Sequence, residues 1–334
     1  MDEPGIIQPH KLERKKWSLK KRLGFFAAAL IVLFVGFFVF RVGHTFSFIN
    51  GGILGKIIHI NSADAPEEKN RIDILIVGLR GEGDVEAGDN LTDTIMVLSI
   101  KTDTKKAALL SIPRDLYVQI PRYGKMEKIN FAYAYGEAVY KDGLSLSTLA
   151  VEKATGINID YAAAINFPTF INVIDALGGI DVWVPKDFSE AQQWGYEFKV
   201  PKGWNHFNSE TALYYARSRY STSDFDRARR QHDILTAVAK KATGLGVLAN
   251  PVKLNRMLDS LAAGVKTDIG FLDMVRLLGY AKSITGDSLA RAVLDDSENG
   301  LLVSGFVNSA YVLYPKAGVE DYTQIHALFQ NIFK

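Results

Sequence analysis

Arginines gather in two short segments of this 334-residue chain. Arg114 stands in SIPRD, directly after an apolar run that is typical of a buried strand. Five more lie close together further on: Arg217, Arg219, Arg227, Arg229 and Arg230. Because guanidinium groups bind phosphate oxygens through paired hydrogen bonds, such a cluster favours a phosphate or pyrophosphate ligand. The ordinary alternative is a solvated helix face, on which the same arginines pair with Asp224 and Asp226.

The spacing of these arginines restricts which of them can share a ligand. Residues 217 and 219 point about 200° apart on a helix, so they can reach one phosphate only if the helix ends between them. The polar run at 220–223 indicates such an end. On the following helix, positions 227 and 230 or 231 lie on one face. We therefore expect two helices with a break between them that lets the arginines converge.

Carboxylates accompany the arginines. Asp93 opens a buried strand, a costly position for a charge unless it is paired or bound to a metal. Glu82 and Asp84 lie in the loop before it, where ordinary solvation is an equally good explanation. Mg²⁺ bridges carboxylate and phosphate oxygens with few protein ligands, so it would account for both groups. Transfer of a phosphoryl group to a hydroxyl also needs a base, for which Asp93 and Asp115 are candidates.

Other residue types exclude several chemistries. The chain has no cysteine, which excludes thiol catalysis, cysteine-based zinc sites and disulfides. The six histidines form no pair with metal-binding spacing, and the sequence has no G-x-S-x-G nucleophile elbow. The glycine-rich turn at 78–84 lacks the Lys-Ser/Thr of a P-loop. The net charge is only +2, and the basic cluster lacks the context of a recognition helix, so we expect no nucleic-acid partner.

The elements that must position these residues alternate between strands and helices. We expect strands at 72–79, 94–100, 106–112, 161–167, 180–185, 290–294 and 309–315. We expect helices at 128–140, 144–156, 168–179, 209–219, 225–244, 251–264, 271–284 and 321–333. This alternation predicts an α/β fold in which helices cover a central sheet. Because the composition does not change after residue 71, we expect one domain over 71–334.

The N-terminal part of the chain predicts a membrane anchor. Residues 23–40 are uncharged and apolar, and as a helix they would span roughly 27 Å. Seven basic residues precede this run, and basic residues beside a membrane span lie on its cytoplasmic side. We therefore expect residues 1–22 to form a cytoplasmic tail and the domain to face outward. Residues 41–70, with several glycines and a polar stretch, read as a linker. A cleaved signal peptide is the alternative, but the run is long and no small-x-small cleavage site follows it.

Five stretches together resemble the LytR-CpsA-Psr family. They are ILIVG…LTDTIMVLSI (74–100), LLSIPRDLYVQIP (109–121), KINFAYAYG (128–136), FINVIDALGGIDVWVP (170–185) and ALYYARSRYSTSDFDRARRQ (212–231). They occur in the family's order and cover roughly residues 71–245, and the single N-terminal anchor matches too. The resemblance implies an α/β/α sandwich with a mixed central sheet and a long apolar pocket for a polyprenyl chain.

The resemblance also implies an activity. Members of the family are held to be phosphotransferases of the cell membrane, with the catalytic domain outside. They move a glycopolymer from a polyprenyl-pyrophosphate carrier onto a sugar hydroxyl of peptidoglycan, and Mg²⁺ bridges the pyrophosphate. Two alternatives use the same site: a polyprenyl-pyrophosphate hydrolase with water as acceptor, and a non-catalytic polyprenyl-phosphate-binding regulatory protein.

Carried over by motif, the family's roles fall on specific residues of this chain. Asp93 would organise the magnesium. The phosphates would be held by Arg114, Arg217 and Arg219, and Asp224 would orient arginines. The remaining matches would form a basic rim and the mouth of the pocket: Arg227, Arg230 and Gln231, then Lys128 and Asn130.

One position departs from the family pattern. The family commonly has aspartate two residues after the glycine that ends the first strand, and here that position is Arg80. We therefore expect Glu82 or Asp84 to replace the missing metal ligand, or Arg80 to contact phosphate directly.

Overall fold

The computed structural model describes residues 70–79, 90–244, 264–270 and 289–334, with a few positions between 273 and 280. The predicted tail, membrane span and nearly all of the linker lie outside the described residues. So do Arg80, Glu82 and Asp84, and most of the helices predicted at 251–264 and 271–284. Within the described ranges, no helix has both the length and the apolar character needed to cross a membrane.

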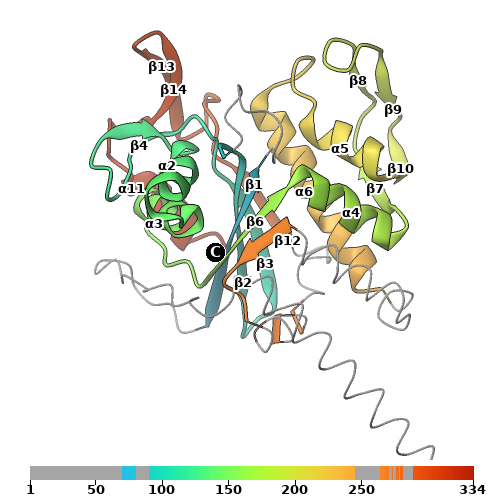
Figure 1. The fold of residues 1–334 in the computed structure, drawn as a ribbon, viewed down its shortest axis with the longest axis horizontal. Helices are drawn as coiled ribbons and strands as arrows, with labels where there is room; N and C mark the ends of the chain where they lie inside the picture. Colours follow the sequence, from blue (N-terminus) through green and yellow to red (C-terminus); the bar gives the residue numbers. More distant parts are fainter. Residues whose placement is uncertain are drawn as a thin grey trace, which may run out of the picture. The chain divides into compact units, whose positions relative to one another are not determined.

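Six strands form a central sheet in the order β11-β6-β1-β2-β3-β12 (Figure 1). Their bounds are β1 (Arg71–Leu79), β2 (Thr92–Lys101), β3 (Lys106–Ser111), β6 (Tyr161–Asn166), β11 (Val265–Thr267) and β12 (Leu289–Val293). Strands β1 and β3 each pair antiparallel with β2, whereas β6 runs parallel to β1 and β12 runs parallel to β3. The sheet is therefore mixed, which confirms the predicted α/β class.

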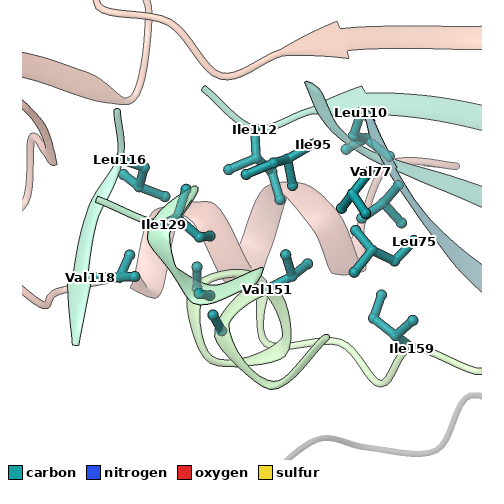
Figure 2. Close-up of a cluster of buried hydrophobic side chains, with 14 of the residues drawn as sticks. Leu75, Val77, Ile95, Leu110, Ile112, Leu116, Val118, Ile129, Val151 and Ile159 are labelled. Atoms are coloured by element: carbon teal, nitrogen blue, oxygen red, sulfur yellow. The ribbon is translucent and has the colours of Figure 1, made fainter. Parts of the chain in front are cut away.

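Side chains alternate along the central strands, and both faces of the sheet are buried. Leu75, Val77 and Val97 point to the first face, toward helices α2 (Phe131–Tyr140), α3 (Gly143–Thr155) and α11 (Thr323–Gln330). Figure 2 shows this core, in which Val151 and Ile159 lie close to Leu75 and Val77.

The second face of the sheet is covered by different helical residues. Ile74, Met96 and Leu98 point to this face, and Leu235 of helix α6 (Asp224–Ala242) packs against the same cluster. Helices thus cover both faces, so the strands can be apolar on each side.

A second apolar core holds the arginine-bearing helices. It joins helices α4 (Phe167–Leu177), α5 (Ser209–Arg217) and α6 to strands β7 (Ile180–Val184), β8 (Phe188–Glu190), β9 (Phe198–Val200) and β10 (Gly203–Phe207). Ile174 and Leu177 lie in this core and are fully buried. Helix α6 contributes to this second core and also packs against the second face of the central sheet. It therefore fixes α5 in relation to the sheet.

The start of one helix was predicted wrongly, and several short strands were not predicted. The helix predicted from residue 128 begins at Phe131, because residues Met126–Lys128 form strand β5, which pairs with β4 (Tyr117–Gln119). Strand β13 (Leu302–Val307) was not predicted, and it pairs with β14 (Ala310–Pro315). Both are short hairpin strands whose partners lie a few residues away, so pairing outweighs the weak periodicity of each segment.

Candidate active site

Strand register brings the two predicted site segments together. Strands β2 and β3 are antiparallel, with Met96 opposite Ser111. The start of β2 and the chain after β3 therefore meet at one edge of the sheet. There, a guanidinium NH₂ group of Arg114 donates to Asp93 Oδ1 at 2.6 Å, and both side chains are mostly buried. The charge partner of Asp93 is thus an arginine from the turn that follows the neighbouring strand.

Backbone hydrogen bonds fix the turn that carries Arg114. The Leu116 amide donates to Pro113 O at 3.0 Å, and the Asn130 amide donates to Arg114 O at 3.3 Å. From the other side, the Leu313 amide donates to Asp115 O at 2.9 Å. Residues 114 and 115 are therefore held between the start of α2 and strand β14, and their side chains need little ordering when a ligand binds.

A pocket of about 470 Å³ opens at this edge of the sheet. It is lined by Leu91, Asp93, Arg114, Asp115, Glu127, Lys128, Asn130, Phe131 and Arg219. Six of these nine were predicted from the sequence: Asp93, Arg114, Asp115, Lys128, Asn130 and Arg219. The lining combines three cationic and three carboxylate side chains. Cationic groups of this kind bind phosphate oxygens, and the carboxylates can orient them, accept a proton or hold a cation.

Lys128 reaches the pocket because it lies in strand β5 and not in a helix. Its Nζ donates to Asp115 Oδ1 at 2.6 Å, while Arg114 Nε lies 3.6 Å from Asp115 Oδ2. Asp115 therefore links Arg114, which follows β3, to Lys128, which lies in β5. Glu127, from the same strand, lines the pocket as well. Sequence reasoning missed Glu127 because it did not predict this hairpin.

The end of helix α5 separates Arg217 from Arg219. The helix ends at Arg217, as predicted, and Ser218 has extended ψ (φ −57°, ψ 133°). Arg219 then lines the pocket, and its amide donates to Gln193 Oε1 at 3.0 Å. The guanidinium of Arg217 instead lies over the ring of Phe167, 4.3 Å from its centroid. The structure therefore brings Arg219, and not Arg217, into the lining of this pocket.

Arg227 of helix α6 contacts Asp93, one of the residues that line the pocket. The side chain is buried, and one guanidinium NH₂ donates to Asp93 O at 3.0 Å and to Asp224 Oδ2 at 2.9 Å. Asp224 thus pairs with Arg227, and its orienting role stays a prediction. A second cavity of about 20 Å³ adjoins this network, and Asp93, Arg114, Asp224, Arg227 and Gln231 are among its lining residues.

Arg230 and Gln231 hold the connection between α5 and α6. Arg230 is buried and donates from Nε to Tyr215 O at 2.9 Å, and from an NH₂ group to Ser218 O. Gln231 donates to Ala216 O at 3.2 Å. These two residues therefore support the segment that presents Arg219. This differs from the predicted basic rim, because the α6 face that carries them packs against α5.

Charges around the pocket stabilise the guanidinium groups. Burial alone would lower the pKa of Arg114, but the carboxylates of Asp93, Asp224 and Asp115 raise it above its ordinary value. Burial lowers the pKa of Arg227, an effect that Asp224 partly offsets. Nε of each arginine is buried without a hydrogen-bond partner among the described residues. Each therefore retains donor capacity that an anion or water can satisfy.

The donor set of the pocket fits Mg²⁺ bound jointly with phosphate. Within the described residues, no group of three or more histidine and carboxylate side chains is arranged to hold a metal. Mg²⁺ needs fewer protein ligands when phosphate oxygens and waters complete its shell. Asp93 and Asp115 supply carboxylates to the pocket that the cationic side chains also line. The predicted alternatives Glu82 and Asp84 lie outside the described residues.

Comparisons with known proteins agree with the sequence motifs and the fold. The family model of the LytR_cpsA_psr family matches residues 54–317. The polyisoprenyl-teichoic acid–peptidoglycan teichoic acid transferase TagU of Enterococcus faecalis is 29% identical over 265 residues, which cover 79% of this chain and 80% of the relative. The TagU protein of Oceanobacillus iheyensis is 35% identical over 241 residues, covering 72% and 71%.

Solved structures show the same fold. The crystal structure of B. subtilis TagV matches with a TM-score of 0.62 and 28% identity, covering 79% of this chain and 97% of that one. TagT bound to LIIa-WTA matches with a TM-score of 0.61 and 24% identity, covering 79% and 91%. Because the family model matches most of the length of this chain, the chain belongs to the LytR_cpsA_psr family.

Proposed function

We propose that this protein transfers a phosphate-linked glycopolymer from a polyprenyl-pyrophosphate carrier to a sugar hydroxyl of peptidoglycan. The observation that carries the proposal is the pocket in which Arg114, Lys128 and Arg219 meet Asp93 and Asp115. Relatives that match most of this chain are named as teichoic acid transferases acting between a polyisoprenyl carrier and peptidoglycan. The names give the reaction class, and the pocket has groups suited to it.

The residues of the pocket divide the work of the reaction. Arg114, Arg219 and Lys128 bind phosphate oxygens and neutralise the charge that builds up in the transition state. The acceptor hydroxyl oxygen attacks the phosphorus that carries the glycopolymer. The bond from this phosphorus to the bridging oxygen breaks, and polyprenyl phosphate leaves. Asp93, paired with Arg114, keeps that guanidinium in position.

Asp115 is the residue that we assign as proton acceptor. Its carboxylate lies in the pocket and contacts Lys128 at 2.6 Å. Asp93 has another role in this proposal, because its side chain positions Arg114 while its backbone oxygen accepts from Arg227. The hydroxyl proton therefore passes to Asp115 as the new phosphodiester bond forms.

We also propose that the reaction depends on Mg²⁺. When bound, the ion would add positive charge at the pyrophosphate oxygens. Asp93 is the carboxylate that we expect to hold it, with phosphate and water as the other ligands. Removing divalent cations with EDTA should abolish turnover, and adding Mg²⁺ should restore it. Full activity after chelation would contradict this part of the proposal.

Acceptor dependence separates the transferase from its alternatives. The full chain is incubated with a short-chain polyprenyl-pyrophosphate glycan and Mg²⁺, with and without peptidoglycan fragments. We expect glycopolymer attachment that requires the fragments and falls about 10²–10³-fold in Arg219→Ala. The matched control is Arg229→Ala, because Arg229 is half exposed on α6 and pairs with Asp226 and Asp295. Release of polyprenyl phosphate without attachment would indicate a hydrolase, and tight binding without turnover a binding protein.

The N-terminal sequence supports a location for this reaction. We propose that residues 23–40 anchor the chain in the cell membrane, with the basic N-terminus in the cytoplasm and the domain outside. In intact cells from which the wall has been removed, added protease should then digest the domain. Digestion only after lysis would contradict this orientation.

A further inference from the structure

A β-hairpin beside the pocket carries two exposed aromatic side chains. Phe306 of β13 lies directly opposite Tyr311 of β14, and their ring centroids are 6.1 Å apart in an edge-on arrangement. Phe306 is 73% exposed and Tyr311 is 39% exposed. Figure 1 shows this hairpin, in red, next to β4. Adjacent exposed aromatic rings contribute little to the core, and next to a pocket they mark a surface that binds something.

The register of the hairpin determines the face on which the two rings lie. Side chains two residues apart share a face of a strand, so Phe306 and Tyr311 lie on the same face as Leu302 and Leu313. Leu302 and Leu313 are buried in the first core of the domain. The aromatic pair therefore continues the hairpin face that packs on the body of the domain, whereas Val303 lies on the opposite face.

The same strand is joined to the pocket. Leu313 lies two residues after Tyr311, and its amide donates to the backbone oxygen of Asp115. Burial raises the pKa of the Tyr311 hydroxyl, and the carboxylates of Asp296, Asp115 and Asp224 raise it further. The negative charges of these carboxylates thus disfavour ionisation of the hydroxyl, which stays protonated at neutral pH. It can donate a hydrogen bond to a ligand at this edge of the pocket.

The chemistry of this surface fits a sugar ring. The C–H bonds on one face of a pyranose pack against an aromatic ring, while its hydroxyls donate to carboxylates and accept from a phenol. An anionic lipid surface fits poorly. Asp295, Asp296 and Glu298 precede the hairpin, and their charges would be repelled by acidic headgroups.

We propose that the β13–β14 hairpin binds the acceptor glycan, with a sugar ring packed against Phe306 and Tyr311 beside the phosphate-binding pocket. This inference rests on the proposed function and adds the acceptor side to it. The glycan would approach along the hairpin, while the arginines and Lys128 hold the carrier phosphates. Binding energy from sugars that do not react would then orient the reacting hydroxyl toward Asp115.

Direct binding tests the hairpin without requiring turnover. The full chain in nanodiscs is mixed with purified glycan strands that lack peptides and glycopolymer, and the bound fraction is measured over a concentration series. We expect Phe306→Ala and Tyr311→Ala each to weaken binding about tenfold, which corresponds to about 1.4 kcal/mol for one ring contact. Val303→Ala is the matched control, because Val303 is 46% exposed on the other face of the same strand. Equal binding by all four proteins would overturn the proposal.

Hydrogen exchange identifies what covers the hairpin. In nanodiscs, amides at 303–311 should gain protection only when glycan strands are added. Protection by the bilayer alone, with no change on adding glycan, would assign the hairpin to a lipid surface and overturn the proposal.

Turnover assays separate this proposal from the proposed function. If the protein is a transferase and the hairpin holds the acceptor, Phe306→Ala should raise KM for the glycan acceptor about tenfold and leave that for the carrier unchanged. Normal transfer with an unchanged acceptor KM would reject the hairpin and leave the transferase intact. Loss of glycan binding in the variants of a protein that shows no turnover would support the hairpin and reject the transferase.

Discussion

At the scale of single residues, the arginines of this protein do two different jobs. Arg114 and Arg219 line the pocket, where charge can act on a ligand. Arg230 is 6% exposed and donates to backbone oxygens of α5 and of the residue that follows it. Residue type alone does not distinguish these two roles, because it gives no information about what packs against a helix face.

Replacing Arg230 by alanine should destabilise the protein. The change leaves the backbone oxygens of Tyr215 and Ser218 without their guanidinium donor in a buried site. Hydrogen bonds to charged groups contribute about 1.5–3 kcal/mol each, so for two bonds we expect a loss of about 3–6 kcal/mol in the free energy of unfolding. Urea denaturation measures it. Arg229→Ala, on the exposed side of α6, should change stability by less than about 0.5 kcal/mol; similar losses in both would contradict this division.

His232 should make stability depend on pH. It lies 2.8 Å from Ser111 Oγ, and burial, then the charges of Arg291 and Arg229, lower its pKa to about 4. Since the pKa in the unfolded chain is about 6.5, this contribution is complete above pH 6.5 and is lost as the pH falls toward 4. Burial raises the pKa of Asp73 to about 6, which acts in the opposite direction.

The effect of His232 is therefore measured as a difference between two proteins. The free energy of unfolding of the wild type, minus that of His232→Gln, should fall between pH 6.5 and pH 4 by about 3 kcal/mol at most. A difference that stays constant over this range would show that His232 ionises normally in the folded protein.

At the scale of elements, the start of α6 positions the site. Ser223 caps this helix: its Oγ accepts from the Asp226 amide at 3.0 Å, and the Asp226 carboxylate accepts from the Ser223 amide at 3.3 Å. Asp224 and Arg227 follow within the first turn of the helix. The cap thus fixes the point from which Arg227 reaches Asp93.

Replacing Ser223 by alanine should lower both stability and activity. Loss of a helix cap costs about 1 kcal/mol, which thermal or urea denaturation can measure. Because the first turn also carries Asp224 and Arg227, we expect transfer to slow more than this loss of stability explains at a temperature where the protein is folded. Ser189→Ala, in strand β8 and outside the pocket lining, serves as the control. Unchanged activity in Ser223→Ala would show that the cap does not position these residues.

Elements were predictable where a segment carries its own local signal. The apolar runs of β1 and β2 and the helical pattern of α3 are local properties, and all three elements are found in the structure. Hairpin β4–β5 and strand β13 were missed because their stability comes from a partner and not from a long apolar pattern. That loss carried over to the site, where Glu127 and the aromatic pair of the second hairpin had no signal in the sequence.

At the scale of the whole molecule, the C-terminal helix is part of the central core. The family model ends at residue 317, before α11. Yet Tyr322, Ile325 and Phe329 of this region are 6%, 1% and 0% exposed and belong to the first core. Arg71 also donates to the backbone oxygen of Phe329 at 2.8 Å, which joins the helix to the first strand of the sheet.

A chain that ends at residue 317 should therefore not fold cooperatively. Burial of each large apolar side chain stabilises a protein by about 1.5–3 kcal/mol, so losing three of them removes much of a typical total of 5–15 kcal/mol. Circular dichroism during heating should show no sharp transition for this chain. Removal of Lys334 alone is the control and should preserve the transition. A cooperative transition in the chain ending at 317 would contradict the assignment of α11 to the core.

The central claim is that charged groups gathered at the ends of β2 and β3 hold the phosphates during glycopolymer transfer. The most direct test compares the rate of attachment to peptidoglycan fragments in wild type, Arg114→Ala and Arg229→Ala at saturating Mg²⁺. We predict a loss of about 10²–10³-fold in Arg114→Ala, and wild-type rates in Arg229→Ala. Near-normal attachment by a folded Arg114→Ala protein would contradict the claim and would place the phosphate-binding site elsewhere in the molecule.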